Sequence, residues 1–181
     1  MSRLPILAVA DAPADSQPLL EAVRKQLGTV PNMMKLLATA PAALEGYLAL
    51  SGALGKGALD AKLRESVALV VSEHNGCDYC LAAHTFVGKN FAKLSDEATA
   101  KARDGLGLDE RTTAALIFAR SVARERGRVQ EAEITALREA GFTDAQVLEI
   151  VVNVALTVLT NYVNNVAQTE LDFPRVSRHT H

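Results

Sequence analysis

The stretch DAKLRESVALVVSEHNGCDYCLAAH, residues 60–84, indicates two helices separated by a sharp turn. Asp60 can cap a first helix, in which apolar residues recur at helical spacing up to about Asn75. Gly76 ends that helix, because glycine adopts the left-handed conformation in which many helices terminate. A second helix is expected to begin near Cys77, so the two could fold into a helical hairpin.

The rest of the chain is also typical of helices. Proline and glycine punctuate its N-terminal part, and capping residues precede the apolar runs of its C-terminal part. No segment alternates well enough between apolar and polar residues to predict a strand. Helices are expected at residues 18–27, between Pro31 and Pro41, from Pro41 onward, at 96–103, 109–126 and 131–140, and from Thr143 onward. The sequence therefore predicts an all-α fold.

The bulk composition agrees with a single helical domain. The chain has 181 residues and no Ser-, Gly- or Pro-rich linker, so residues 1–181 are expected to share one compact domain. Hydrophobic residues make up 49% of the chain and aromatic residues only 4%. A core of Ala, Leu and Val suits close helix packing better than it suits sheets.

Charge and hydropathy argue against several classes of partner. The net charge of -2 provides no basic stripe and the chain lacks Trp, so we expect no nucleic-acid partner. The apolar run near the N-terminus is too short for a signal peptide. The longest apolar stretch, 147–163, is interrupted by Glu149, Asn153, Thr157 and Asn161, which favours a buried or interface helix over a membrane span. A cytoplasmic protein without a membrane partner is expected.

An internal repeat emerges when the chain is shifted by 84 residues against itself. Glu65 then matches Glu149, and the related helical units cover about 41–91 and 109–170. In the same alignment, Cys77, Cys80 and His84 match Asn161, Asn164 and Gln168. These three matching residues are polar but redox-inert. Chemistry is therefore expected only in the first unit.

The reactive residues form a C-x-x-C-x-x-x-H motif at the start of a helix. Residues three and four apart share a helix face, so Cys77 and Cys80 lie together and His84 lies one turn beyond. Free backbone N–H groups at the helix start and a nearby imidazolium both stabilise a thiolate. Such a short loop restrains the unfolded chain little, so the spacing indicates redox chemistry and not a structural disulfide.

A thiolate that attacks a peroxide becomes a sulfenic acid, which a second cysteine converts to a disulfide. We assign the attack to Cys80, because His84 lies one turn away as a base, and the resolving step to Cys77. Many C-x-x-C enzymes attack with the first cysteine, and the sequence does not exclude that order. A helical hairpin would also fold Glu65 back against His84, where it could orient the imidazole.

Structural zinc is the main inorganic alternative for this motif. A closed zinc site needs four ligands, whereas only His84 and His74 accompany the two cysteines, with His74 beyond the helix break. We expect neither a metal nor an organic cofactor.

Glu65, Cys77, Cys80 and His84 together resemble the motif of the alkylhydroperoxidase-D-like (AhpD-like) branch of the carboxymuconolactone decarboxylase superfamily. The resemblance extends over residues 41–87, 160–162 and 170–174. It implies a duplicated all-helical fold, homotrimers or hexamers, and a peroxidase whose disulfide is reduced by a thiol or dithiol partner protein. The chain departs from the studied peroxidases at Tyr79, where they carry a histidine. Tyrosine, with a pKa of about 10, is no base at neutral pH.

The function expected from these residues is thiol-dependent reduction of hydroperoxides in antioxidant defence. A disulfide oxidoreductase using the same cysteines is the enzymatic alternative, and a redox-sensing oligomer is the non-enzymatic one. Lactone decarboxylation ranks below them, because the decarboxylases are not defined by this cysteine pair.

Overall fold

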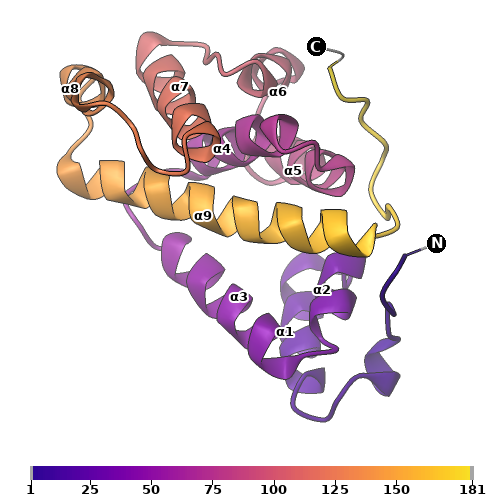
Figure 1. Ribbon diagram of the computed structural model, residues 1–181. Coiled ribbons are helices and arrows are strands. Elements are labelled where there is room, and N and C mark those ends of the chain that lie inside the picture. Colours follow the sequence, from indigo (N-terminus) through magenta and orange to yellow (C-terminus); the bar gives the residue numbers. More distant parts are fainter. Residues whose placement is uncertain (1, 180–181) are drawn as a thin grey trace.

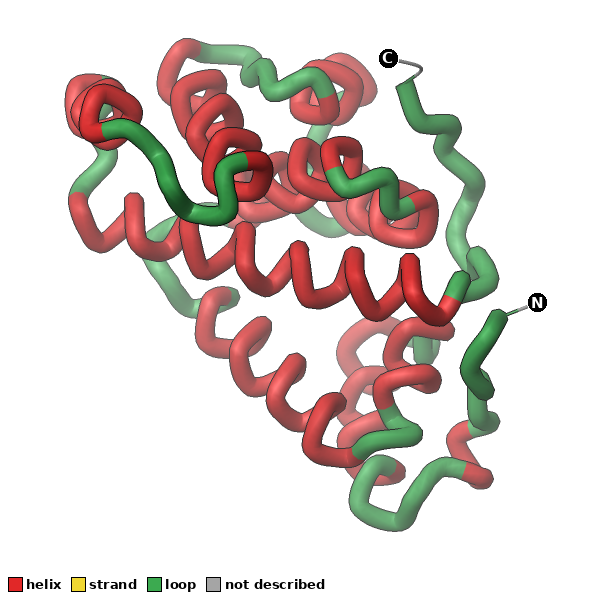
Figure 2. Tube along the Cα trace, viewed as in Figure 1, coloured by secondary structure: helices red, strands yellow, loops and turns green. Residues whose placement is uncertain are grey.

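A computed structural model describes residues 2–179 and shows nine α-helices and no strand within that range. The helices are α1 (Gln17–Leu27), α2 (Asn32–Leu37), α3 (Pro41–Leu54), α4 (Ala61–His74), α5 (Asp78–Asn90), α6 (Asp96–Arg103), α7 (Glu110–Arg124), α8 (Glu131–Glu139) and α9 (Asp144–Ala167), preceded by a 3-10 turn, η1 (Val9–Asp11). Helices and connecting loops account for the whole described trace (Figure 2). The predicted all-α class is confirmed. Residues 1, 180 and 181 of the expected domain lie outside the described part.

Helix α9 crosses the middle of the molecule (Figure 1). Helices α4 to α8 lie on one side of it, and α1 to α3 lie on the other. Its length and composition alone would allow it to cross a membrane. Its buried face, however, carries polar residues that form hydrogen bonds inside the protein: Asn161 donates to Ser72 Oγ at 3.1 Å, and Asn75 donates to Asn161 Oδ1 at 2.8 Å. The helix therefore packs as the central element of this fold.

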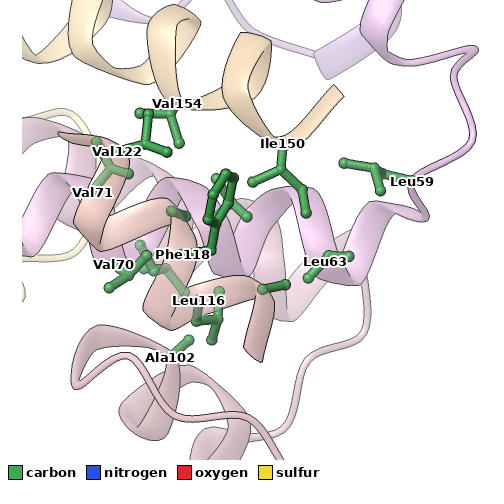
Figure 3. Packing of buried hydrophobic residues seen from close by; sticks show 14 of the residues in the cluster. Leu59, Leu63, Val70, Val71, Ala102, Leu116, Phe118, Val122, Ile150 and Val154 are labelled. Atoms are coloured by element: carbon green, nitrogen blue, oxygen red, sulfur yellow. The ribbon is translucent and has the colours of Figure 1, made fainter. Parts of the chain in front are cut away.

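The buried apolar residues form two clusters. The larger one is built mainly on α4, α7 and α9, to which Val70, Phe118 and Ile150 respectively belong (Figure 3). The smaller one joins α1, α2 and the start of α3 to the first turn of α5 and includes Cys77 and Cys80. The N-terminal helices therefore cover the cysteine pair.

Local sequence signals explain the hairpin formed by α4 and α5. The Asp60 side chain caps α4 by accepting a hydrogen bond from the Leu63 N–H at 2.8 Å. Gly76 follows the helix with φ of +62°, a left-handed conformation that glycine adopts without a steric penalty. The chain then reverses, and α5 returns alongside α4.

The two units predicted from the repeat differ at this turn. The residue that matches Gly76 at a shift of 84 is Thr160, and there α9 continues without a break over its 24 residues. The first unit therefore has a hairpin where the second has one straight helix. Helix α7 also ends at Arg124, two residues before its expected end, because Arg126 already has a positive φ of +54°.

Candidate active site

Cys77 and Cys80 are joined by a disulfide, with their Cα atoms 5.3 Å apart. Cys77 is the N-cap of α5, and its sulfur accepts a hydrogen bond from the backbone N–H of Cys80 at 3.2 Å. The two sulfurs therefore lie at the N-terminal end of a helix, as the spacing predicts. The unpaired N–H groups and the dipole of this helix end favour a thiolate once the disulfide is reduced.

Both cysteines are buried. Cys77 is 0% exposed and Cys80 is 2% exposed, and Met33, Leu37 and Leu44 of α2 and α3 belong to the cluster that covers them. Electrostatic interactions are stronger in such a water-poor environment than at the surface. The few polar groups that reach the sulfurs therefore have a large influence on their reactivity.

Glu65 and His84 face each other across the hairpin. The Nδ1 atom of His84 lies 2.8 Å from Oε2 of Glu65, and both side chains are partly exposed. A carboxylate can only accept a hydrogen bond, so Nδ1 must carry the proton. The other ring nitrogen, Nε2, is then the one available to take up or release a proton. The predicted contact between α4 and α5 is present, with His84 one helical turn after Cys80.

Tyr79 is held by two hydrogen bonds. Its hydroxyl donates to Oδ1 of Asp172 at 2.8 Å and accepts from the Met33 N–H at 3.1 Å. Burial raises the pKa of Tyr79 far above its ordinary value, and the negative charge of Asp172 adds to this effect. Tyr79 is thus no source of protons at neutral pH, and its hydroxyl ties α5 to α2 and to the C-terminal segment.

Asp172 and Phe173 complete this connection. The second oxygen of Asp172 accepts a hydrogen bond from the Asn32 N–H at 2.6 Å. The ring of Phe173 lies edge-on to Tyr79, with their centroids 5.8 Å apart, and also packs against Phe86. The segment after α9 therefore holds α2 over the cysteine pair.

Tyr79→Phe is expected to lower the free energy of unfolding by about 1–3 kcal/mol, because it leaves a buried N–H and a carboxylate without their shared partner. Urea unfolding monitored by circular dichroism measures this change. Equal stability of the Tyr79→Phe variant and the parent protein would show that the hydroxyl does not hold the three segments together.

Two further residues near the site were not identified from the sequence. Burial raises the pKa of Tyr47 in α3 to about 12, and the negative charge of the nearby Glu65 carboxylate adds to this effect. Asn164 of α9 donates from Nδ2 to the Cys80 sulfur at 3.4 Å. No spacing rule links Tyr47 to the motif, whereas the repeat had placed Asn164 opposite Cys80 without indicating contact.

A cleft of about 720 Å³ opens beside the disulfide. It lies between the start of α5, the end of α9 and the segment that follows α9, and its lining is mainly polar, with Gly76, Tyr79, Asn164, Thr169, Arg175 and Arg178 among the lining residues. Tyr79 and Asn164 line this cleft and also contact the residues around the cysteine pair. The cleft therefore offers a route by which a small molecule could approach the sulfurs.

His74, considered above as a zinc ligand, lies at the end of α4 in a cationic setting. Burial lowers its pKa, and the positive charges of Arg124 and Arg120 lower it further. Among residues 2–179, no group of three or more His, Cys, Asp or Glu side chains could hold a metal ion.

Comparison with known proteins agrees with these features. Residues 41–100, which include both cysteines, Glu65 and His84, match the model of the carboxymuconolactone decarboxylase family. No curated protein matches the chain.

Solved structures show the same fold over nearly the whole chain. A peroxidase-related protein with an alkylhydroperoxidase AhpD core from Ralstonia eutropha JMP134 is 29% identical, with a TM-score of 0.85 over 94% of this chain and 92% of its own. A peroxidase-related protein from Silicibacter sp. TM1040 is 28% identical, with a TM-score of 0.82 over 93% and 91%. The debrominase Bmp8 is 18% identical, with a TM-score of 0.78 over 92% and 90%, and shares the fold. Residues 41–100 thus match the carboxymuconolactone decarboxylase family, and the chain as a whole has the AhpD-like fold of these peroxidase-related structures.

Proposed function

We propose that the protein is a thiol-dependent peroxidase that reduces hydroperoxides through Cys77 and Cys80. The observation that carries this proposal is the disulfide at the start of α5, one helical turn from a His84 imidazole that Glu65 orients at 2.8 Å. A redox-active pair and a proton-transfer group thus share one hairpin.

In the proposed reaction, the Cys80 thiolate attacks one oxygen of the hydroperoxide. An S–O bond forms, the O–O bond breaks, and the leaving oxygen departs with the electron pair and takes a proton from protonated His84, giving an alcohol. Cys77 then attacks the sulfur of the Cys80 sulfenic acid. An S–S bond forms, and hydroxide leaves and becomes water with the proton released by Cys77. The two electrons that reduce the peroxide come from the two thiols.

Glu65 has a positioning role in this scheme. Its carboxylate fixes the tautomer of His84 and stabilises the imidazolium that forms when the ring takes up a proton. Tyr79 replaces the histidine of the studied peroxidases but does not replace its proton transfer, since its hydroxyl is committed to Asp172. The proton path proposed here therefore consists of His84 and Glu65 alone.

The burial of both sulfurs favours a small hydroperoxide over a protein disulfide as the oxidant. A disulfide exchange partner must bring its own sulfur into direct contact with the attacking thiolate. Cys77 and Cys80 are 0% and 2% exposed, so a folded protein could not reach them without moving α2 or the segment after α9. A disulfide oxidoreductase would need this movement in both half-reactions, whereas a peroxidase would need it only for re-reduction, which is the reason to rank peroxide reduction first.

The oxidised pair must be reduced again for turnover. We propose a thiol or dithiol protein as the reductant in the cytoplasm. Its thiol would reach the disulfide from the cleft beside Gly76 and Tyr79 once the segment after α9, which forms one wall of that cleft, has moved aside. The scheme requires neither a metal nor an organic cofactor.

Turnover assays with two oxidants test the proposed function. With a dithiol reductant in excess, an organic hydroperoxide should be consumed catalytically, and a small linear disulfide should be consumed more slowly. Faster consumption of the disulfide would favour the oxidoreductase alternative. A pair that oxidises once and never turns over with any donor would favour a redox sensor.

The proposed assembly is a homotrimer or a hexamer. Helix α9 carries an outward apolar stripe with alternating spacings of four and three residues, the pattern by which helices pack along one seam. Its members are Leu148, Val152, Ala155, Leu159, Tyr162 and Val166. Leu148, Tyr162 and Val166 are each more than 60% exposed in the single chain, so burial against another copy would be favourable.

Light scattering at micromolar concentration should give a mass that is a multiple of three chains. Leu148→Asp should dissociate the assembly, because it places a charge on the stripe, whereas Leu108→Asp should not, because Leu108 is 56% exposed in the loop between α6 and α7 and does not belong to the stripe. A parent protein that stays monomeric, or equal effects of both variants, would contradict this assembly.

We also propose that the units at about 41–91 and 109–170 are related by duplication. Support comes from the pairing of Cys80 with Asn164, which match at a shift of 84 and also touch in space. The straight α9 would then be the copy that lost the turn at Gly76.

A further inference from the structure

The orientation of the Asn164 side chain is determined by contacts outside the cysteine pair. Its Nδ2 atom donates to the backbone carbonyl of Thr160 at 2.9 Å. A carbonyl only accepts hydrogen bonds, so the NH₂ end of the amide must face it. The second hydrogen of the same NH₂ group is then directed to the Cys80 sulfur, 3.4 Å away. Asn164 is only 3% exposed, so bulk water competes little for this contact.

We propose that Asn164 is a positioning residue that stabilises the Cys80 thiolate and orients the hydroperoxide. A hydrogen bond to a charged acceptor is stronger than one to a neutral acceptor. The amide therefore favours the ionised sulfur over the thiol and lowers the pKa of Cys80. The orientation of the hydroperoxide rests on the proposed function, whereas the stabilisation of the Cys80 thiolate does not.

The other end of the amide supports the second part. Oδ1 of Asn164 is buried and has no hydrogen-bond partner among residues 2–179, and Asn164 lines the cleft beside the disulfide. Buried carbonyl oxygens are rarely left without a donor. A hydroperoxide supplies one through its O–H group, and that hydrogen bond would hold the peroxide next to the sulfur that attacks it. Asn164 itself exchanges no atom or electron in the reaction.

Helix α9 also offers a matched control. Asn161 lies one turn before Asn164, is 0% exposed and carries the same side chain, but its amide bonds to Ser72 and Asn75 and not to a sulfur. Asn161→Ala therefore removes comparable hydrogen bonds from the same buried face. Any difference between Asn161→Ala and Asn164→Ala then reports the contact with Cys80.

The thiol pKa can be measured without any peroxidase assay. In a Cys77→Ser background, Cys80 is the only thiol, and serine also caps the start of a helix. The rate of alkylation by iodoacetamide is followed against pH. Asn164→Ala should raise the pH midpoint of Cys80 by about one to two units and slow alkylation at neutral pH by up to about 10- to 100-fold. Asn161→Ala should leave the midpoint unchanged.

Asn164→Asp provides a second variant of similar volume, in case the alanine variant folds poorly. Its carboxylate would place a like charge beside the thiolate and should raise the midpoint further. Circular dichroism establishes that each variant is folded. An unchanged midpoint in both Asn164 variants would overturn the inference. A raised midpoint in a protein that fails to turn over any hydroperoxide would support the thiolate contact and contradict the proposed function instead.

Discussion

Glu65→Gln is expected to lower hydroperoxide turnover by about 10²- to 10⁴-fold, the usual contribution of a positioned proton-transfer group. Glutamine keeps the size of the side chain and an oxygen that can accept from Nδ1 of His84. It removes the negative charge that stabilises the imidazolium 2.8 Å away. The loss should appear in the steady-state rate with a competent dithiol donor, while the circular dichroism spectrum stays that of the parent protein.

Glu149→Gln is the matched control for this variant. Glu149 matches Glu65 when the sequence is shifted by 84 residues, but its carboxylate accepts from the backbone N–H groups of Ala58 and Leu59, at 2.8 and 3.1 Å for Oε2. This variant should lower thermal stability and leave turnover near that of the parent protein. Near-full activity in both variants would show that the Glu65 charge plays no part in proton transfer.

Cys80→Ser is expected to abolish peroxide reduction, because it removes the proposed nucleophile. Cys77→Ser should instead complete the first chemical step and stop there. One equivalent of hydroperoxide should convert Cys80 to a sulfenic acid that persists, since no second thiol is present to form a disulfide. Trapping with dimedone, followed by peptide mass spectrometry, measures this product.

The opposite pattern would reverse the two roles. A trapped sulfenic acid on Cys77 in the Cys80→Ser protein would mean that the cysteine at the helix N-cap attacks first. The hydrogen bond from the Cys80 N–H to the Cys77 sulfur would then have the role proposed for the Asn164 amide. Trapping in neither variant would indicate that the pair does not react with peroxides.

Local features of the fold could be predicted from the sequence because short-range chemistry determines them. Asp60 caps α4, Gly76 ends the first arm of the hairpin and Thr143 begins α9 with a capping box, as their side chains and spacing indicate. The proximity of Cys77 and Cys80 follows from helical geometry in the same way. To predict the contact between Glu65 and His84, only one further assumption was needed, namely that the two helices fold back on each other at the turn.

Long-range packing accounts for what the sequence could not show. Nothing local indicates that Met33 and Leu37 cover the cysteines, or that Asp172 accepts the hydrogen bond of Tyr79, which lies 93 residues earlier. The repeat suggested that Asn164 had no chemical role, because amides are redox-inert. Its place beside the Cys80 sulfur depends on how α9 packs against the hairpin, and no periodicity encodes that arrangement.

The most direct test of the central claim is a single-turnover measurement on the fully reduced parent protein. One equivalent of an organic hydroperoxide is added, and the intact mass, the free thiols and the remaining peroxide are measured together. The proposed chemistry predicts that the peroxide is consumed in equal amount, that both thiols disappear and that the protein mass falls by two hydrogen atoms. Unconsumed peroxide with both thiols free, under conditions that oxidise a control dithiol, would contradict it.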